Sequence, residues 1–202
     1  MTVYVLIATL LDFSGATADK VTVRAGTSTL QTGGTLVKAK RIIIHPQYNR
    51  RNLDKDAALI NLDSPLPLNG GSIRAARLIN SGAIVLPGRL LTASGWGYIR
   101  PDIATFSQKL QAVAVPVVDN LTCKELYSTR YVVTDNMLCA GYLDGGKDAC
   151  TGDAGGPLVD SNRTLVGIVS WGDGCARSFS PGVYTRISSA SVRDFIRTNS
   201  GV

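Results

Sequence analysis

Short runs of β-branched residues, separated by turn-forming residues, are the feature that most constrains the fold of this chain. Most of these runs are bounded by Gly, Pro, Asn or Asp. They cover residues 21–25, 36–45, 57–62, 90–94, 110–118, 165–171 and 182–187. Many short strands at fairly regular spacing predict an all-β barrel or sandwich. Only the tail differs, because Val192, Phe195 and Ile196 recur at helical spacing and predict a short C-terminal helix over 191–199.

The composition is that of a globular protein. The chain has 202 residues, of which 45% are hydrophobic and 18% charged, enough for one domain or two small lobes that share an interface. The net charge of +6 is spread thinly, and Arg50 and Arg51 lie close to Asp54 and Asp56. We therefore expect solvated surface and no nucleic-acid partner. The best candidate boundary between two halves is the stretch 101–107.

The cysteines predict an exported protein. Cys123, Cys139, Cys150 and Cys175 form an even set without Cys-x-x-Cys spacing, and the only histidine, His45, is far away in sequence. Two disulfides fit this pattern better than a zinc site, and we expect neither a metal nor a cofactor. Two patterns for N-linked glycosylation, at 120–122 and 162–164, agree with export, although such short patterns often occur by chance.

The N-terminus allows two interpretations. Residues 3–11 are apolar and 16–18 are small, as in a secretory signal, yet no Lys or Arg precedes the apolar run. The run is also too short to span a bilayer, so we expect no membrane association. We favour a buried strand followed by a turn, and the signal peptide stays open as the alternative.

From Arg24 to the end, the chain resembles the trypsin/chymotrypsin serine peptidases. The segment 152–157 resembles the family's nucleophile loop, Gly-Asp-Ser-Gly-Gly-Pro, with Ala154 in place of the serine. The Asp-Phe-Ile-Arg tail and the Ser-Gly-Trp-Gly-Tyr run are similar to those of fungal and arthropod trypsins. Landmarks in the family's order occupy residues 24–27, 45–48, 56–60, 94–97, 139–141, 147–157, 167–172 and 181–185.

The resemblance implies two packed antiparallel β-barrels with the active site between them. A single domain over 1–202 would then comprise an N-terminal barrel remnant in 1–100 and a C-terminal barrel plus helix in 108–202. The first strands of the family are not recognisable in this chain, so we expect the N-terminal barrel to be incomplete. The resemblance also implies that Cys123 pairs with Cys139 and that Cys150 pairs with Cys175.

The catalytic residues carry over incompletely. In the family a serine attacks, a histidine moves the proton and a buried aspartate orients the histidine. Asp56 matches the aspartate, whereas Ala154 replaces the nucleophile. The segment 5–11 places Leu10 or Leu11 at the histidine. His45 cannot take over, because the family's His-Pro-x-Tyr strand lies away from the cleft.

The resemblance also assigns roles around the nucleophile. The backbone N–H groups of Gly152 and Ala154 match the oxyanion hole. Asp153 matches the aspartate that pairs with the new ammonium group of an activated Ile-Val-Gly-Gly terminus. That segment does not occur in the printed sequence, so we expect the loop to relax towards a zymogen-like shape.

The binding side is better preserved. Asp148 matches the carboxylate at the base of the trypsin specificity pocket, which recognises Arg or Lys. Gly172 and Gly182 match the glycines that keep this pocket open. The strand Ser170-Trp171-Gly172 would pair with an extended peptide.

Three functions follow from this comparison. The first is an active endopeptidase that cleaves after Arg or Lys. The second, which we favour, is a catalytically inactive homologue, expected to be a monomer, that binds peptides or proteins with exposed Arg or Lys, or serine-protease inhibitors. The third is a truncated or mutated form of an active secreted trypsin-like endopeptidase.

Overall fold

The strands form two sheets, one open and one closed. The computed structural model describes residues 4–7, 17–68 and 70–202. The open sheet is antiparallel, with strand order β1-β4-β3-β2. A short 3-10 helix, η1 (Ala18–Lys20), precedes β2. The strands of this sheet are β1 (Tyr4–Ile7), β2 (Thr22–Ala25), β3 (Thr35–Ile44) and β4 (Ala58–Leu62).

The second sheet closes on itself. Its order is β11-β8-β7-β6-β9-β10-β5, and β10 also pairs with β11, so that the strands β6 to β11 form a six-stranded barrel. The remaining strand, β5, adds to β10 in parallel. The strands are β5 (Arg77–Leu78), β6 (Leu90–Gly95), β7 (Gln111–Val118), β8 (Met137–Ala140), β9 (Pro157–Val159), β10 (Thr164–Trp171) and β11 (Gly182–Arg186).

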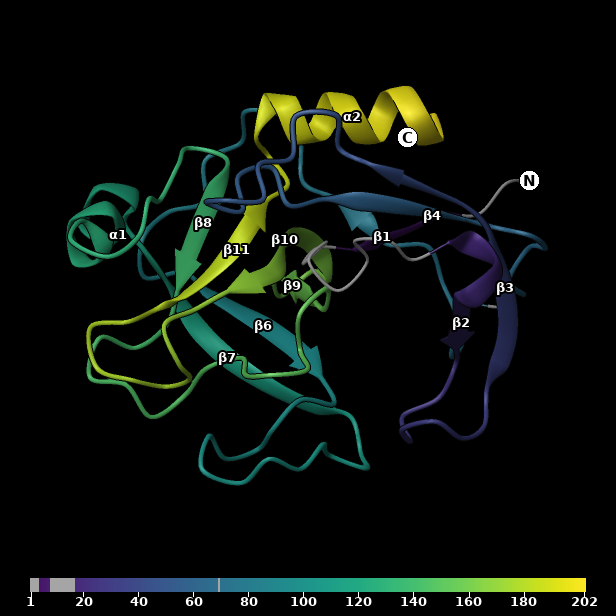
Figure 1. Cartoon of the computed structure of the whole chain (residues 1–202), viewed down its shortest axis with the longest axis horizontal. Helices are drawn as coiled ribbons and strands as arrows, with labels where there is room; N and C mark the ends of the chain where they lie inside the picture. The colour runs from purple at the N-terminus through teal and green to yellow at the C-terminus, as the bar shows by residue number, and fades with distance from the viewer. Residues whose placement is uncertain (1–3, 8–16, 69) are drawn as a thin grey trace.

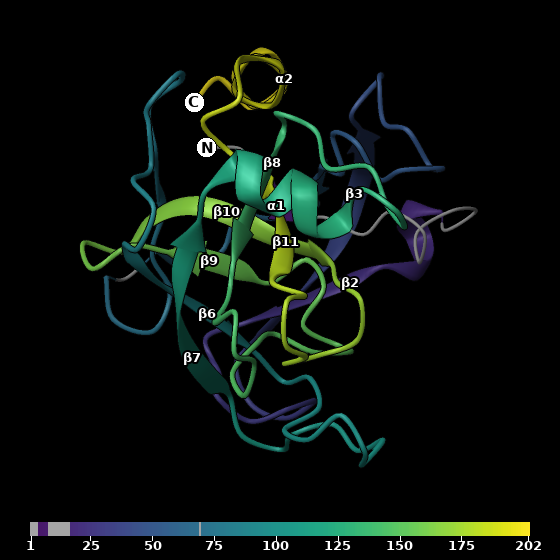
Figure 2. The same cartoon turned by 90° about the vertical axis from the view of Figure 1, so that its left-hand side faces the viewer.

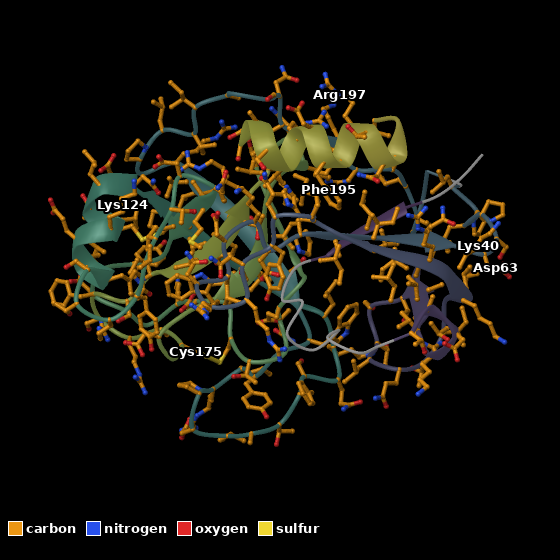
Figure 3. The ribbon with its side chains drawn as sticks, turned by 45° about the horizontal axis from the view of Figure 1, so that its top comes forward. Lys40, Asp63, Lys124, Cys175, Phe195 and Arg197 are labelled. Atoms are coloured by element: carbon orange, nitrogen blue, oxygen red, sulfur yellow. A yellow bond between two sulfur atoms is a disulfide. The ribbon has the colours of Figure 1, made fainter. Side chains whose placement is uncertain are left out.

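Two helices cover this framework. Helix α2 (Ala190–Ser200) lies across the top of the molecule in Figure 1, whereas α1 (Asn120–Tyr127) lies on the outside of the barrel and faces the viewer in Figure 2. Val192, Phe195 and Ile196 of α2 are buried, as their spacing predicts, and pack with Ile168 of β10. Phe195 lies on the inner side of α2, while Arg197 extends from its outer side (Figure 3). In the described part of the chain, no helix is long and apolar enough to cross a membrane.

The predicted fold class is confirmed. The structure is mostly β, with a closed C-terminal barrel, a second, four-stranded sheet in the described N-terminal part and a short C-terminal helix. Both predicted disulfides, Cys123–Cys139 and Cys150–Cys175, are formed. The strand interpretation of the N-terminus holds for Tyr4–Ile7, which pair with β4. The other residues of 3–11 lie outside the described residues.

The expected boundary between the halves needs correction. Strands β5 and β6 fall within 1–100, yet they pair with β10, β7 and β9 of the second sheet. The chain therefore passes from the open sheet to the barrel between Leu62 and Arg77, and not at 101–107. The segment 101–107 lies within the loop between β6 and β7, two neighbouring strands of the barrel. Turn-forming residues alone do not distinguish such a loop from a linker.

Candidate functional site

Asp56 lies where the open sheet meets the barrel. It is fully buried and precedes β4, which belongs to the open sheet. The Ser170 hydroxyl of β10 donates to Asp56 Oδ2 over 2.6 Å, and the Thr185 hydroxyl of β11 donates to the Asp56 carbonyl over 2.6 Å. Two barrel strands thus fix both the side chain and the backbone of this aspartate.

His45 directly follows β3, and its N–H donates to the carbonyl of Ala57, the neighbour of Asp56, over 2.9 Å. Its ring is 3% exposed and packs against Phe195 of α2, with ring centroids 4.9 Å apart. Nδ1 accepts from the Gln47 N–H over 3.1 Å, so Nε2 carries the proton and donates to the Ser191 carbonyl over 3.3 Å. Burial lowers the pKa of His45. The neutral ring therefore fastens the residue after β3 to α2, and its two nitrogens are engaged by Gln47 and Ser191.

A single pocket contains most of the predicted binding residues. Its volume is about 360 Å³, and its walls are formed by the segments on either side of the Cys150–Cys175 disulfide. The lining includes Asp148, Gly152, Ala154, Ser170, Trp171, Gly172 and Gly182. Residues separated by more than thirty positions in the sequence are thus brought together around one cavity. A cavity of this size accommodates a long side chain or a small organic cation.

The floor of the pocket is polar and incompletely satisfied. Asp148 Oδ2 accepts from the Ala176 N–H over 3.0 Å, whereas Asp148 Oδ1 is buried without a hydrogen-bond partner among the described residues. The hydroxyl of Tyr184, which is fully buried, is likewise without a partner in this part of the chain. Burial raises the pKa of Asp148 to about 6. A buried anion with an unused oxygen favours a cationic ligand that donates hydrogen bonds.

Gly182 makes room for this floor. A Cβ atom at position 182 would lie 2.7 Å from Asp148 Oδ1 and 3.2 Å from the Tyr184 ring and hydroxyl. Any side chain here would therefore displace the carboxylate or fill the entrance to it. Gly172 has more space, because its nearest neighbour would be the Gly174 carbonyl oxygen at 3.2 Å.

The nucleophile loop presents a methyl group and two unused N–H groups. Ala154 and Gly152 are exposed and line the pocket, and Gly152 has φ +93°, a conformation that favours glycine. Neither residue's N–H donates to another described residue. The loop can therefore offer hydrogen bonds to an anionic or carbonyl oxygen, but a methyl group cannot serve as a nucleophile.

Asp153 is held from behind by backbone amides. Its Oδ1 accepts from the Gly97 N–H over 2.8 Å and its Oδ2 from the Cys150 N–H over 2.9 Å. Side chains at Gly95 or Gly97 would collide with this carboxylate. Both carboxylate oxygens thus have protein partners, which restrains the loop. The relaxation towards a zymogen-like shape stays a prediction.

Trp171 and two tyrosines form an aromatic wall beside the pocket. The Trp171 ring packs against Tyr127 and Tyr131, with centroids 5.1 and 5.4 Å apart. The Tyr127 hydroxyl donates to the Pro181 carbonyl over 2.7 Å, which ties α1 to the strand that carries Gly182. This wall stiffens one side of the pocket.

Sequence reasoning missed several parts of this site. It did not identify Tyr184, although its position two residues after Gly182 on a strand indicates that both face the same side. It also missed the short strands β5, β8 and β9. Helix α1 was missed as well, because it has only two buried residues, Cys123 and Tyr127. Leu10, predicted at the histidine position, and Leu11 lie outside the described residues. Among the described residues, no group of three or more His, Cys, Asp or Glu side chains could hold a metal ion.

The fold and site define a two-part β protein with an acidic pocket in its closed barrel. Comparison with known proteins gives the same class by an independent route. A family model described as Trypsin matches residues 13–196. The chain therefore belongs to the trypsin family of serine peptidases.

Several similar curated proteins come from insects. The chain is 43% identical over 180 residues to Trypsin 5G1 of Aedes aegypti, which covers 89% of this chain and 66% of that protein. It is 46% identical over 155 residues to Trypsin eta of Drosophila melanogaster, covering 77% and 58%, and 39% identical over 177 residues to the Vitellin-degrading protease of Bombyx mori, covering 88% and 65%. The chain thus spans less than two thirds of the length of these relatives.

Proposed function

We propose that this trypsin homologue binds exposed Arg or Lys side chains without hydrolysing the peptide that carries them. The observation that carries the proposal is the floor of the pocket, where Asp148 Oδ1 and the Tyr184 hydroxyl are buried without partners among the described residues. A guanidinium or ammonium group would satisfy both, since it supplies several donors and the opposite charge. Peptides, proteins and serine-protease inhibitors with an exposed basic side chain are the proposed partners.

The loss of catalysis is proposed from Ala154 and from the expected position of Leu10. In a serine peptidase, losing the nucleophile or the histidine costs on the order of 10⁶ in turnover, and the two losses do not multiply. Asp56, Gly152 and Ser170 then serve only to shape the site.

The test compares the chain with pocket variants. Benzamidine binding is measured by calorimetry and hydrolysis by release of product from an arginine ester. We expect binding without hydrolysis in the unmodified chain. Asp148→Asn, which keeps the shape and removes the charge, should weaken binding by at least about 100-fold, in line with the loss of a desolvated charge pair. Tyr184→Phe, which keeps the carboxylate, should weaken it far less. Equal binding by the chain and Asp148→Asn would contradict the proposal.

The second candidate is a truncated or mutated form of an active secreted endopeptidase. It is favoured by the identity of 39–46% to proteins named as trypsins or a protease. The variant Ala154→Ser/Leu10→His distinguishes the two. Strong hydrolysis of the arginine ester by this variant would support a damaged enzyme. Hydrolysis by the unmodified chain would contradict the loss of catalysis.

Export is part of the same proposal. All four cysteines form disulfides, an arrangement that persists in oxidising compartments. The test alkylates free thiols in cultured source cells and in their medium. If the chain is secreted, the protein recovered from the medium should contain both disulfides. Recovery of reduced protein from the cytosol alone would contradict export.

A further inference from the structure

The two N-linked glycosylation patterns lie in different environments. Asn162 belongs to the turn between β9 and β10, which projects from the barrel in Figure 2. It is exposed, and its side chain makes no hydrogen bond within the described residues. Asp160 organises the turn, because its Oδ1 accepts from the N–H groups of Asn162 and Thr164 over 2.9 Å each. The Asn162 amide therefore extends into solvent from a turn whose shape does not depend on it.

The other pattern begins at Asn120, the first residue of α1. Asn120 is half-buried, and its Oδ1 is buried without a partner among the described residues. Its Nδ2 donates to Asp135 Oδ1 over 3.2 Å, and Lys124 bonds to the same oxygen over 2.7 Å. Cys123, three residues later, is fully buried in the disulfide with Cys139. A sugar on Asn120 would disrupt this end of the helix.

We propose that Asn162 is the site of an N-linked oligosaccharide in the folded protein and that Asn120 is not modified. The proposal rests on the export proposed above. A lipid-linked oligosaccharide pyrophosphate supplies the sugar. A bond forms between Asn162 Nδ2 and C1 of the first sugar, the bond from C1 to the pyrophosphate oxygen breaks, Nδ2 loses a proton to a base of the transferase, and the lipid pyrophosphate leaves.

The folded structure selects between the two sites after the sugar has been transferred. Transfer takes place on an extended chain, so both patterns are open to the transferase before folding. A sugar on Asn162 meets only solvent in the native state. A sugar on Asn120 opposes formation of α1 and of the Cys123–Cys139 disulfide beside it. The native, disulfide-bonded population should therefore carry sugar at Asn162 alone.

The oligosaccharide would leave the pocket accessible. The turn joins β10 at Thr164, and the nearest residue of this strand that lines the pocket is Val169. Five residues of extended strand separate the two by about 17 Å. We therefore expect benzamidine affinity to be the same with and without the sugar.

The test uses the full chain behind a cleavable secretion signal in a eukaryotic host. The fraction with the Cys123–Cys139 disulfide is isolated and treated with peptide N-glycosidase, which converts a glycosylated asparagine to aspartate. Peptide mass spectrometry should find aspartate at 162 and asparagine at 120. Removal of the sugar by the glycosidase should also change the gel mobility of the protein. Asn162→Gln and Thr164→Ala should each abolish this mobility shift, whereas Asn120→Gln and Thr164→Ser should each keep it.

Two results would overturn the proposal. One is an unmodified Asn162 in the disulfide-bonded fraction. If too little protein folds to isolate this fraction, the same result in the total intracellular protein counts against the proposal. The other is a sugar on Asn120 in the disulfide-bonded fraction. Failure of the proposed function would be distinguishable from failure of this proposal. If neither the glycosylated chain nor Asn162→Gln binds benzamidine, the proposed function fails, but the modified asparagine found by mass spectrometry stays the same.

Discussion

The closed barrel and the open sheet divide the site unequally. Every residue that lines the pocket comes from the barrel and its loops, between Asp148 and Tyr184. Asp56 and the predicted histidine position at Leu10 belong to the N-terminal half. Both disulfides also lie in the barrel half. The pocket can therefore keep its shape independently of the open sheet, whereas catalysis in this family needs both halves in register.

Recognition and catalysis therefore have separate structural requirements in this protein. The barrel closes through the β10–β11 pairing and leaves no free edge among β6 to β11, while β1 and β2 are edge strands of the described open sheet. The unpaired N–H and C=O groups of an edge strand can form hydrogen bonds with a strand of another chain. We expect the two halves to differ in stability as they differ in closure.

Hydrogen exchange should give the largest contrast. Amides in the register Ile168↔Thr185 of β10 and β11 should exchange about 1,000-fold more slowly than those in Val23↔Val37 of β2 and β3, because local opening of an open sheet costs less. Native-state exchange read by mass spectrometry measures both. Equal protection would show that the open sheet is as stable as the barrel.

Removal of the Cys123–Cys139 disulfide should destabilise the barrel by about 3 kcal/mol, because the closed loop restricts the unfolded chain. Cys123→Ala/Cys139→Ala avoids burying new hydroxyl groups in this packed site. Denaturant unfolding followed by Trp fluorescence measures the loss. A loss near zero would mean that packing around Tyr127, and not the cross-link, holds α1 on the barrel.

The pH dependence of ligand binding should depend on Asp148. Its pKa is raised to about 6 by burial, and a cation binds the ionised form, so benzamidine affinity should fall about tenfold per pH unit well below pH 6. The contribution of Asp148 to the stability of the ligand-free protein has the opposite dependence on pH. The raised pKa means that the folded state binds more protons between about pH 4 and 6, so this group's contribution to stability falls as pH rises through that window.

Calorimetry at a series of pH values checks the binding prediction. Asp148→Asn provides the control, because it should bind weakly with no inflection near pH 6. An inflection retained in that variant would assign the titration to another group.

The smallest effect is expected where the two halves meet. Asp54 accepts hydrogen bonds from Thr134 and from Asn136, whose Nδ2 lies 3.0 Å from Asp54 Oδ1. Asp54→Ala should lower the free energy of unfolding by about 1 kcal/mol, since it removes these bonds. Asp63→Ala is the matched control, as this exposed acid on the open sheet makes no side-chain hydrogen bond or ion pair within the described residues (Figure 3). Equal unfolding curves for both variants would show that the hydrogen bonds of Asp54 do not stabilise the contact between the two halves.

Sequence reasoning predicted the parts of this molecule that depend on local pattern. The long strands and α2 follow from β-branched runs and from the spacing of Val192, Phe195 and Ile196. The short strand β5 depends on a partner far away in the sequence, β10, and β9 has only three residues, too few to show an alternating pattern, so no local pattern indicated either strand. The resemblance placed Asp148 and Gly182, whereas the unpartnered Tyr184 hydroxyl depends on burial that only the assembled barrel creates.

Contact of Trp171 with Tyr127 of α1 and with Tyr131 gives the pocket its own optical signal. The chain has two tryptophans, and Trp171 lines the cavity within an aromatic cluster, whereas Trp96 lies in the β6–β7 loop and donates to the Ser28 carbonyl. A ligand that enters the pocket displaces water from the Trp171 ring and changes its emission. Trp96→Phe therefore leaves a single indole, at the place where recognition occurs, and occupancy can be followed in solution without a label.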